Sequence, residues 1–231
     1  MAELYLNYNK TVGEIDNYIS KYPFLSVVGI GDSTEGQVYA LMFGEGETVI
    51  TYVGGEDGGD MISPSVLLRF VRDICSLYEE KGSAFGFSAE NIFKNYTLVI
   101  IPMLSSDYTG EAQTGNVCNF FKYGMTPNIL LTFRKSNENN GMIYFGEGET
   151  ENKMAVALSQ MSALKRNFRV SEEPRITLAD WSIENLRASA FSIDLPNFNY
   201  NNGKQFSDKS FSLYAKMRKT LFCTPFLSKI K

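Results

Sequence analysis

The sequence predicts an α/β fold in a single domain, residues 1–231, with a mixed, mostly parallel twisted sheet and helices on both faces. Segments with the apolar pattern of strands alternate with segments of helical pattern along the whole chain. The run YTLVIIPM at 96–103 is almost continuously apolar, as expected for a central parallel strand. No linker-like segment interrupts this alternation, and 231 residues suffice for a sizeable core.

A helix is predicted first, over residues 11–22. Its apolar residues recur at helical spacing, Thr11 and Glu14 have the spacing of a capping box, and Pro23 follows its end. Three strands are predicted next, over residues 24–30, 37–43 and 48–53. The GEGE turn at 44–47 predicts that the last two form a hairpin.

The middle of the chain continues the alternation. A long helix is predicted with Ser63 as N-cap and Pro64 at its first position, followed by a short helix over 89–94. Beyond the apolar run at 96–103, strands are predicted over 128–133, 142–145 and 188–195, and helices over 150–165 and 207–222.

The composition excludes several classes of function. The chain contains no histidine, so it cannot use an imidazole base or metal ligand, which removes most Ser-His-Asp, Cys-His and zinc-hydrolase mechanisms. The net charge is −4 with scattered basic residues, which gives no electrostatic case for binding nucleic acid.

The cysteines and the N-terminus bear on the compartment. Cys75, Cys118 and Cys223 are far apart and odd in number, which suits a reducing environment. MAELYLNYNK has neither a basic start nor an apolar core, and no apolar run approaches about 18 residues. We therefore expect a soluble, cytoplasmic chain with no membrane association.

The segment GGEDGGD at 54–60 is the most informative loop. It follows a predicted strand and precedes a predicted helix, a position where open α/β sheets keep their active sites. Taken alone, Asp57 and Asp60 are typical of turns and helix starts. Asp194 is less ordinary, because a carboxylate within an apolar strand requires a partner.

Six segments carry a resemblance to a known family. They are IDNYISKYPFLSVVGIGDSTEGQVYALMFGEGE (15–47), GGEDGGDMISPSVLLRFV (54–71), LVIIPMLSSDY (98–108), GNVCNFF (115–121), ILLTFRKS (129–136) and DWSIENLRASAFSIDLPN (180–197). In this order they resemble the zinc carboxypeptidase family (metallocarboxypeptidases and related bacterial cell-wall peptidases). The resemblance covers nearly the whole chain and implies the fold of that family.

The resemblance also implies a site, and this chain departs from it. The family holds one zinc ion with two histidines and a glutamate; the matching positions here are Asp57, Arg134 and Asp60 respectively. The family's general-base glutamate matches Asp194, and the first residue of its carboxylate-binding Asn-Arg pair matches Asn119, which Phe120 follows.

An arginine cannot coordinate a metal, because its guanidinium offers only donors. A guanidinium could instead neutralise the carboxylates that a lost zinc ion leaves behind. The sequence therefore predicts a vacated metal site with no metal or other cofactor, and an ion pair of Arg134 with Asp57, Asp60 or Asp194.

Three functions remain open at this point. The first is a pseudoenzyme that keeps the peptidase fold and acts as a binding or regulatory module for peptides or cell-wall fragments. The second is an active hydrolase in which Asp194 and Asp57 or Asp60 share a proton and activate water. The third is a structural or oligomerising protein. The sequence gives neither the substrate nor the oligomeric state.

Overall fold

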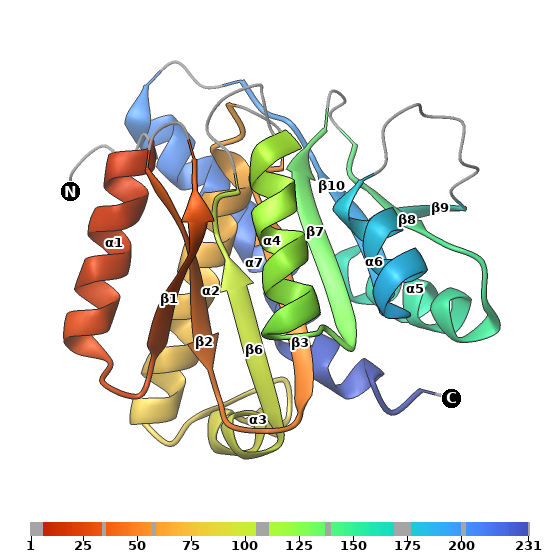
Figure 1. Cartoon of the computed structure of the whole chain (residues 1–231). Coiled ribbons are helices and arrows are strands. Elements are labelled where there is room, and N and C mark those ends of the chain that lie inside the picture. The colour runs from red at the N-terminus through yellow and green to blue at the C-terminus, as the bar shows by residue number, and fades with distance from the viewer. Residues whose placement is uncertain are drawn as a thin grey trace.

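A computed structural model describes residues 7–33, 36–56, 59–104, 111–136, 140–168, 177–199 and 202–230 (Figure 1). The helices are α1 (Tyr8–Lys21), α2 (Ile62–Glu79), α3 (Ala89–Asn95), α4 (Glu111–Tyr123), α5 (Glu149–Ser162), α6 (Leu178–Leu186) and α7 (Gly203–Leu227). The strands are β1 (Ser26–Asp32), β2 (Gln37–Phe43), β3 (Thr48–Gly54), β4 (Ser83–Ala84), β5 (Phe87–Ser88), β6 (Tyr96–Ile101), β7 (Ile129–Lys135), β8 (Met142–Phe145), β9 (Lys165–Phe168) and β10 (Ser189–Leu195).

Within these residues one sheet has the strand order β1-β2-β6-β3-β7-β10-β8-β9. The pairs β6–β3, β3–β7, β7–β10 and β8–β9 are parallel, and β1–β2, β2–β6 and β10–β8 are antiparallel. The sheet is therefore mixed and mostly parallel, as the sequence predicts. β3, β6 and β7 are central and almost wholly buried, which explains their continuous apolar runs.

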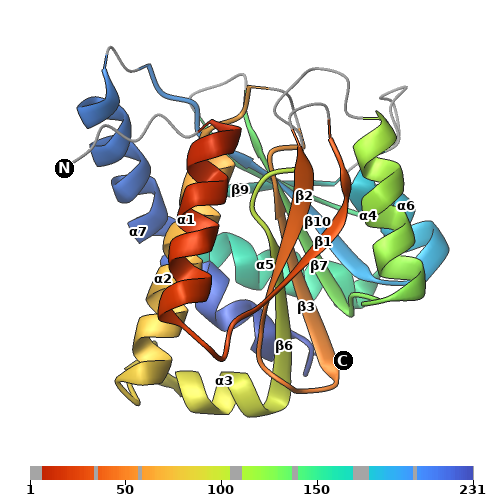
Figure 2. The same cartoon turned by 60° about the vertical axis from the view of Figure 1, so that its left-hand side comes forward.

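Helices cover both faces of the sheet (Figure 2). One core packs residues of α1, α2, α5 and α7 against the sheet, among them Ile15, Val66, Leu158 and Phe222. A second, smaller core packs Val117 and Phe121 of α4 and Leu178 of α6 against the opposite face. Strand residues alternate between the two cores. The predicted fold class is thus confirmed.

The predicted hairpin of residues 37–43 and 48–53 is wrong, because β6 lies between β2 and β3. The segment that connects β2 and β3 forms hydrogen bonds to α3 and β6. The N–H of Glu45 donates to the carbonyl of Phe93, and the hydroxyl of Thr97 donates to the carbonyl of Gly46. A Cβ on Gly46 would lie 2.0 Å from the carbonyl carbon of Asn95. The glycines thus permit close contact with the start of β6.

Two predicted helix starts also differ from the structure. α1 begins at Tyr8, where the Asn7 side chain accepts from the N–H of Lys10, so Thr11 lies inside the helix. α2 begins at Ile62 with Met61 at the N-cap position. Because the Met61 side chain makes no capping hydrogen bond, the carboxylate of Asp60 accepts the first helical N–H groups in its place.

Candidate functional site

The described residues that match the family's zinc ligands and general base come from the carboxyl ends of neighbouring strands. Arg134 lies near the end of β7 and Asp194 near the end of β10, and the two are register partners in this parallel pair. Asp60 follows β3, the other neighbour of β7. Arg134 and Asp194 lie two residues beyond Thr132 and Ser192, so they extend the face that α4 and α6 cover.

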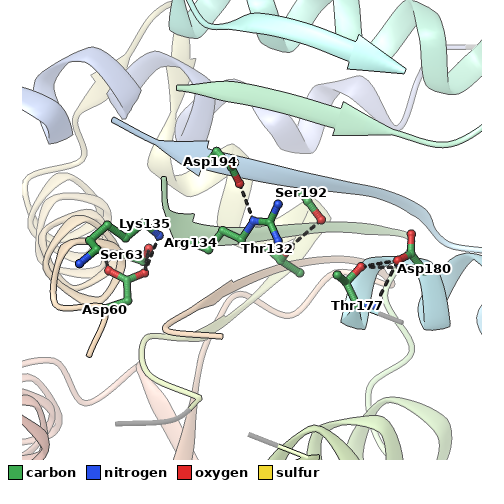
Figure 3. A network of polar contacts seen from close by, with 9 residues as sticks. All are labelled: Asp60, Ser63, Thr132, Arg134, Lys135, Thr177, Asp180, Ser192 and Asp194. Carbon is green, nitrogen blue, oxygen red and sulfur yellow. Dashed lines mark hydrogen bonds and ion pairs between the residues drawn. The ribbon is translucent and has the colours of Figure 1, made fainter. Parts of the chain in front are cut away.

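Arg134 and Asp194 form an ion pair, as the sequence predicts (Figure 3). The Nε of Arg134 donates to Oδ1 of Asp194 at 2.5 Å. The two side chains are only 20% and 12% exposed, so little water screens the pair. The guanidinium carbon also lies 5.7 Å from the ring centre of Tyr144 on β8. One oxygen of the residue that matches the family's general base is therefore bound to a cation.

Asp60 is 3% exposed and is compensated by donors of a different kind. Its Oδ1 accepts from the N–H groups of Ile62 and Ser63 at 2.8 and 3.1 Å. Its Oδ2 accepts from the hydroxyl of Ser63 at 2.5 Å and from the N–H of Lys135 at 3.0 Å. Burial raises the pKa of the Asp60 carboxyl, and the hydrogen bonds from these donors offset part of that rise.

These contacts give Asp60 a structural role. Two of the residues that donate to it, Ile62 and Ser63, belong to the first turn of α2, and the third, Lys135, ends β7. The carboxylate therefore joins the start of a helix to the end of a strand, and Figure 3 shows it turned toward Ser63 and Lys135. The partner in β7 lies 75 residues away along the chain, which no local pattern reveals.

The described residues at the ligand positions, Asp60 and Arg134, do not fit a zinc ion. Zinc of this family needs ligands with free lone pairs. A carboxylate offers about four lone-pair sites, and those of Asp60 are already directed at its hydrogen-bond donors. Arg134 has no lone pair to give. Within the described residues, no cluster of three His, Cys, Asp or Glu side chains is arranged to hold a metal.

Two predicted site residues remain, Asp57 and Asn119. Asp57 lies outside the described residues. Asn119, at the position of the family's carboxylate-binding asparagine, is exposed on α4. Its predicted role in substrate binding stays a prediction.

Sequence reasoning missed two contacts next to the site. The carboxylate of Glu56, within GGEDGGD, accepts from the N–H of Leu178 at 2.9 Å and so attaches this loop to the start of α6. The hydroxyl of Thr132 donates to that of Ser192 at 3.2 Å between β7 and β10. The helix α6 itself was not predicted, although Thr177 and Asp180 form a capping box there. The three-residue spacing of Thr177 and Asp180 is the local signal that could have predicted this helix.

Comparison with known proteins identifies the family of this chain. Residues 12–143, more than half of the chain, match the family described as zinc carboxypeptidase. The chain belongs to the zinc carboxypeptidase family. Among curated proteins, no sequence matches it.

Solved structures of the family share the fold. A metallo-carboxypeptidase from Burkholderia cenocepacia superposes with a TM-score of 0.76 and 12% identity over 96% of this chain and 69% of that one. The structure of bovine thrombin-activatable fibrinolysis inhibitor in complex with tick carboxypeptidase inhibitor gives a TM-score of 0.74, with 13% identity over 98% and 97%. Carboxypeptidase A from Helicoverpa armigera gives 0.71, with 8% identity over 97% and 74%.

At such low identities, these superpositions establish the fold alone. The chemistry of this chain has to be inferred from its own residues. In the described part of the chain, no helix is both long and apolar enough to cross a membrane.

Proposed function

We propose that this member of the zinc carboxypeptidase family does not perform zinc-dependent hydrolysis and acts as a binding or regulatory module for peptides or cell-wall fragments. The ion pair of Arg134 with Asp194 is the observation that carries the proposal. It puts a permanent cation at the position of one zinc ligand and engages the carboxylate at the position of the general base.

Asp60 supports the same proposal. A metal ligand in this position would have to exchange its hydrogen bonds to Ile62, Ser63 and Lys135 for the metal, which would leave buried donors without acceptors. Restoring the family's site therefore means rebuilding the start of α2 as well as changing side chains.

The carboxylate-dyad alternative is less well supported. A shared proton requires two carboxyl groups in hydrogen-bonding reach of each other. Asp60 accepts from Ser63 and Lys135, and Asp194 accepts from Arg134. No hydrogen bond links Asp60 with Asp194 in the part of the chain that the structure describes. A dyad that uses Asp57 would involve a residue outside that part.

Metal analysis of the purified protein, combined with a carboxypeptidase assay on an N-acylated dipeptide with and without added zinc, tests the proposal. We expect less than about a tenth of a zinc ion per chain and no turnover above background. An authentic zinc carboxypeptidase in the same buffer serves as the positive control. Stoichiometric zinc with turnover would refute the proposal, and turnover that persists in a metal chelator would favour the carboxylate dyad.

Binding is measured separately. Peptides with a free C-terminal carboxylate and soluble cell-wall muropeptides are titrated by calorimetry into the wild type and into Asn119→Ala. Binding that Asn119→Ala weakens would support a ligand at the family's substrate position. Absence of binding to every ligand would favour the structural or oligomerising role, which a mass measurement in solution then examines.

A further inference from the structure

A groove of about 450 Å³ opens on the side of the sheet opposite the Arg134–Asp194 pair. Its lining comes from the end of α5, the residues just before β8 and the middle of α7. Met161, Leu164, Pro196, Leu213 and Met217 line it. Leu213 and Met217 are buried members of the larger core, and Met161 and Leu164 are half-buried against it. The groove thus reaches the main hydrophobic core.

Two lysines line the groove in addition to these apolar residues. Lys165 at the start of β9 and Lys216 on α7 line the groove, and both are exposed. No aspartate or glutamate is among the described residues that line it. The hydroxyl of Ser162 is already engaged, because it donates to the carbonyl of Leu158 and accepts from the N–H of Leu164. The charges that the groove presents to a ligand are therefore positive.

The groove is separate from the family site. Along β10, Ile193 and Leu195 point to the core that includes Leu213, whereas Asp194 points to the opposite face. Pro196 follows directly on β10, so the two places share a strand end and use different faces of it.

We propose that this groove binds a small monocarboxylate with an apolar body, of the size of a medium-chain fatty acid. The volume falls in the range of about 300–1,000 Å³ that is usual for small-molecule sites. The apolar lining suits the hydrocarbon body, and the thioether side chains of Met161 and Met217 adapt to irregular shapes. The ammonium groups of Lys165 and Lys216 attract the carboxylate. This site does not depend on the function proposed for the other face.

Calorimetric titration with sodium octanoate tests the proposal. We expect saturable binding to the full chain, with acetate and 1-octanol each at least about tenfold weaker, because one lacks the apolar body and the other the charge. Equal binding of 1-octanol would show a merely apolar cavity and overturn the proposal, as would no binding of octanoate. Tighter binding of a tripeptide that ends in leucine would assign the groove to peptide C-termini and likewise overturn it.

A pair of double variants isolates the lysines. Lys165→Gln with Lys216→Gln removes both positive charges, and we expect octanoate to bind about tenfold more weakly. Arg166→Gln with Lys219→Gln is the matched control, because these exposed residues lie on the same strand and helix, carry the same charge and do not line the groove. An equal loss in both double variants would mean that only the general field of the protein acts, and the proposed site would be wrong.

A second pair of variants locates the ligand on the apolar lining. Met161→Glu places a carboxylate beside the proposed site, whereas Met161→Gln gives a neutral side chain of similar shape. Because Met161 is half-buried at the end of α5, we expect both variants to fold, which thermal unfolding checks. Octanoate should bind Met161→Glu at least about tenfold more weakly than Met161→Gln. Equal affinities would place the ligand elsewhere.

Discussion

The carboxylates of Asp60 and Asp194 both lie at the carboxyl ends of strands in one sheet, and the cost of burying them is compensated in different ways. Asp60 is almost fully buried and is surrounded by neutral donors from the start of α2 and the end of β7. Asp194 is slightly more exposed and is paired with a full positive charge on Arg134. A buried carboxylate can thus be compensated either by neutral donors or by a cation in an ion pair.

The difference lies in what each residue connects. Asp60 accepts from three backbone N–H groups, which need acceptors whatever the side chains are. Asp194 and Arg134 satisfy each other, and replacing both can leave the surrounding backbone intact. Removing the partners of each acid should therefore change the free energy of unfolding by different amounts.

The largest effect is expected from Asp60→Ala. This change leaves the N–H groups of Ile62 and Ser63 and that of Lys135 without their acceptor, and it removes the capping of α2. We expect the free energy of unfolding to fall by about 3–5 kcal/mol, measured by urea denaturation. Glu90→Ala, an exposed acid on α3, is the control and should change stability by less than about 0.5 kcal/mol. A small loss for Asp60→Ala would mean that water replaces the carboxylate.

A smaller loss is expected from Arg134→Gln. The variant leaves the carboxylate of Asp194 without its cation in a site that is mostly shielded from water. We expect a loss of about 1–3 kcal/mol in the same denaturation experiment. The double variant Arg134→Gln with Asp194→Asn should recover much of it, because a neutral amide pair needs no counter-charge. No recovery would mean that Arg134 stabilises the fold through other contacts, such as its position near Tyr144.

The finest distinction is a dependence of stability on pH. Burial raises the pKa of Asp60 above its ordinary 3.8, so the folded protein binds this proton more tightly than the unfolded chain does. The stability of the wild type relative to Asp60→Asn should therefore be greatest below pH 3.8 and should fall as the pH rises through the raised pKa. Urea titrations of both proteins from pH 3 to pH 7 measure this difference. A rise over the same range would mean that the hydrogen bonds outweigh the burial.

Much of the fold can be read from local sequence, whereas the order of the strands in the sheet cannot. The limits of β2 and β8 agree with the predicted ranges 37–43 and 142–145, because strands with a continuous or alternating apolar pattern are recognisable alone. The prediction failed at the neighbour of β2. Both β3 and β6 have the composition of a central strand, and only packing of the whole chain places β6 between β2 and β3.

The sequence alone determined that this chain cannot build the histidine-containing zinc site of its family, because it contains no histidine. The order of its motifs also determined the family, and the arginine at a ligand position implied an ion pair. Only the tertiary structure showed that Asp194 pairs with that arginine, because this contact depends on the register of β7 against β10. It also showed that Asp60 joins α2 to a strand end 75 residues away, since contacts over such distances form only when the sheet assembles.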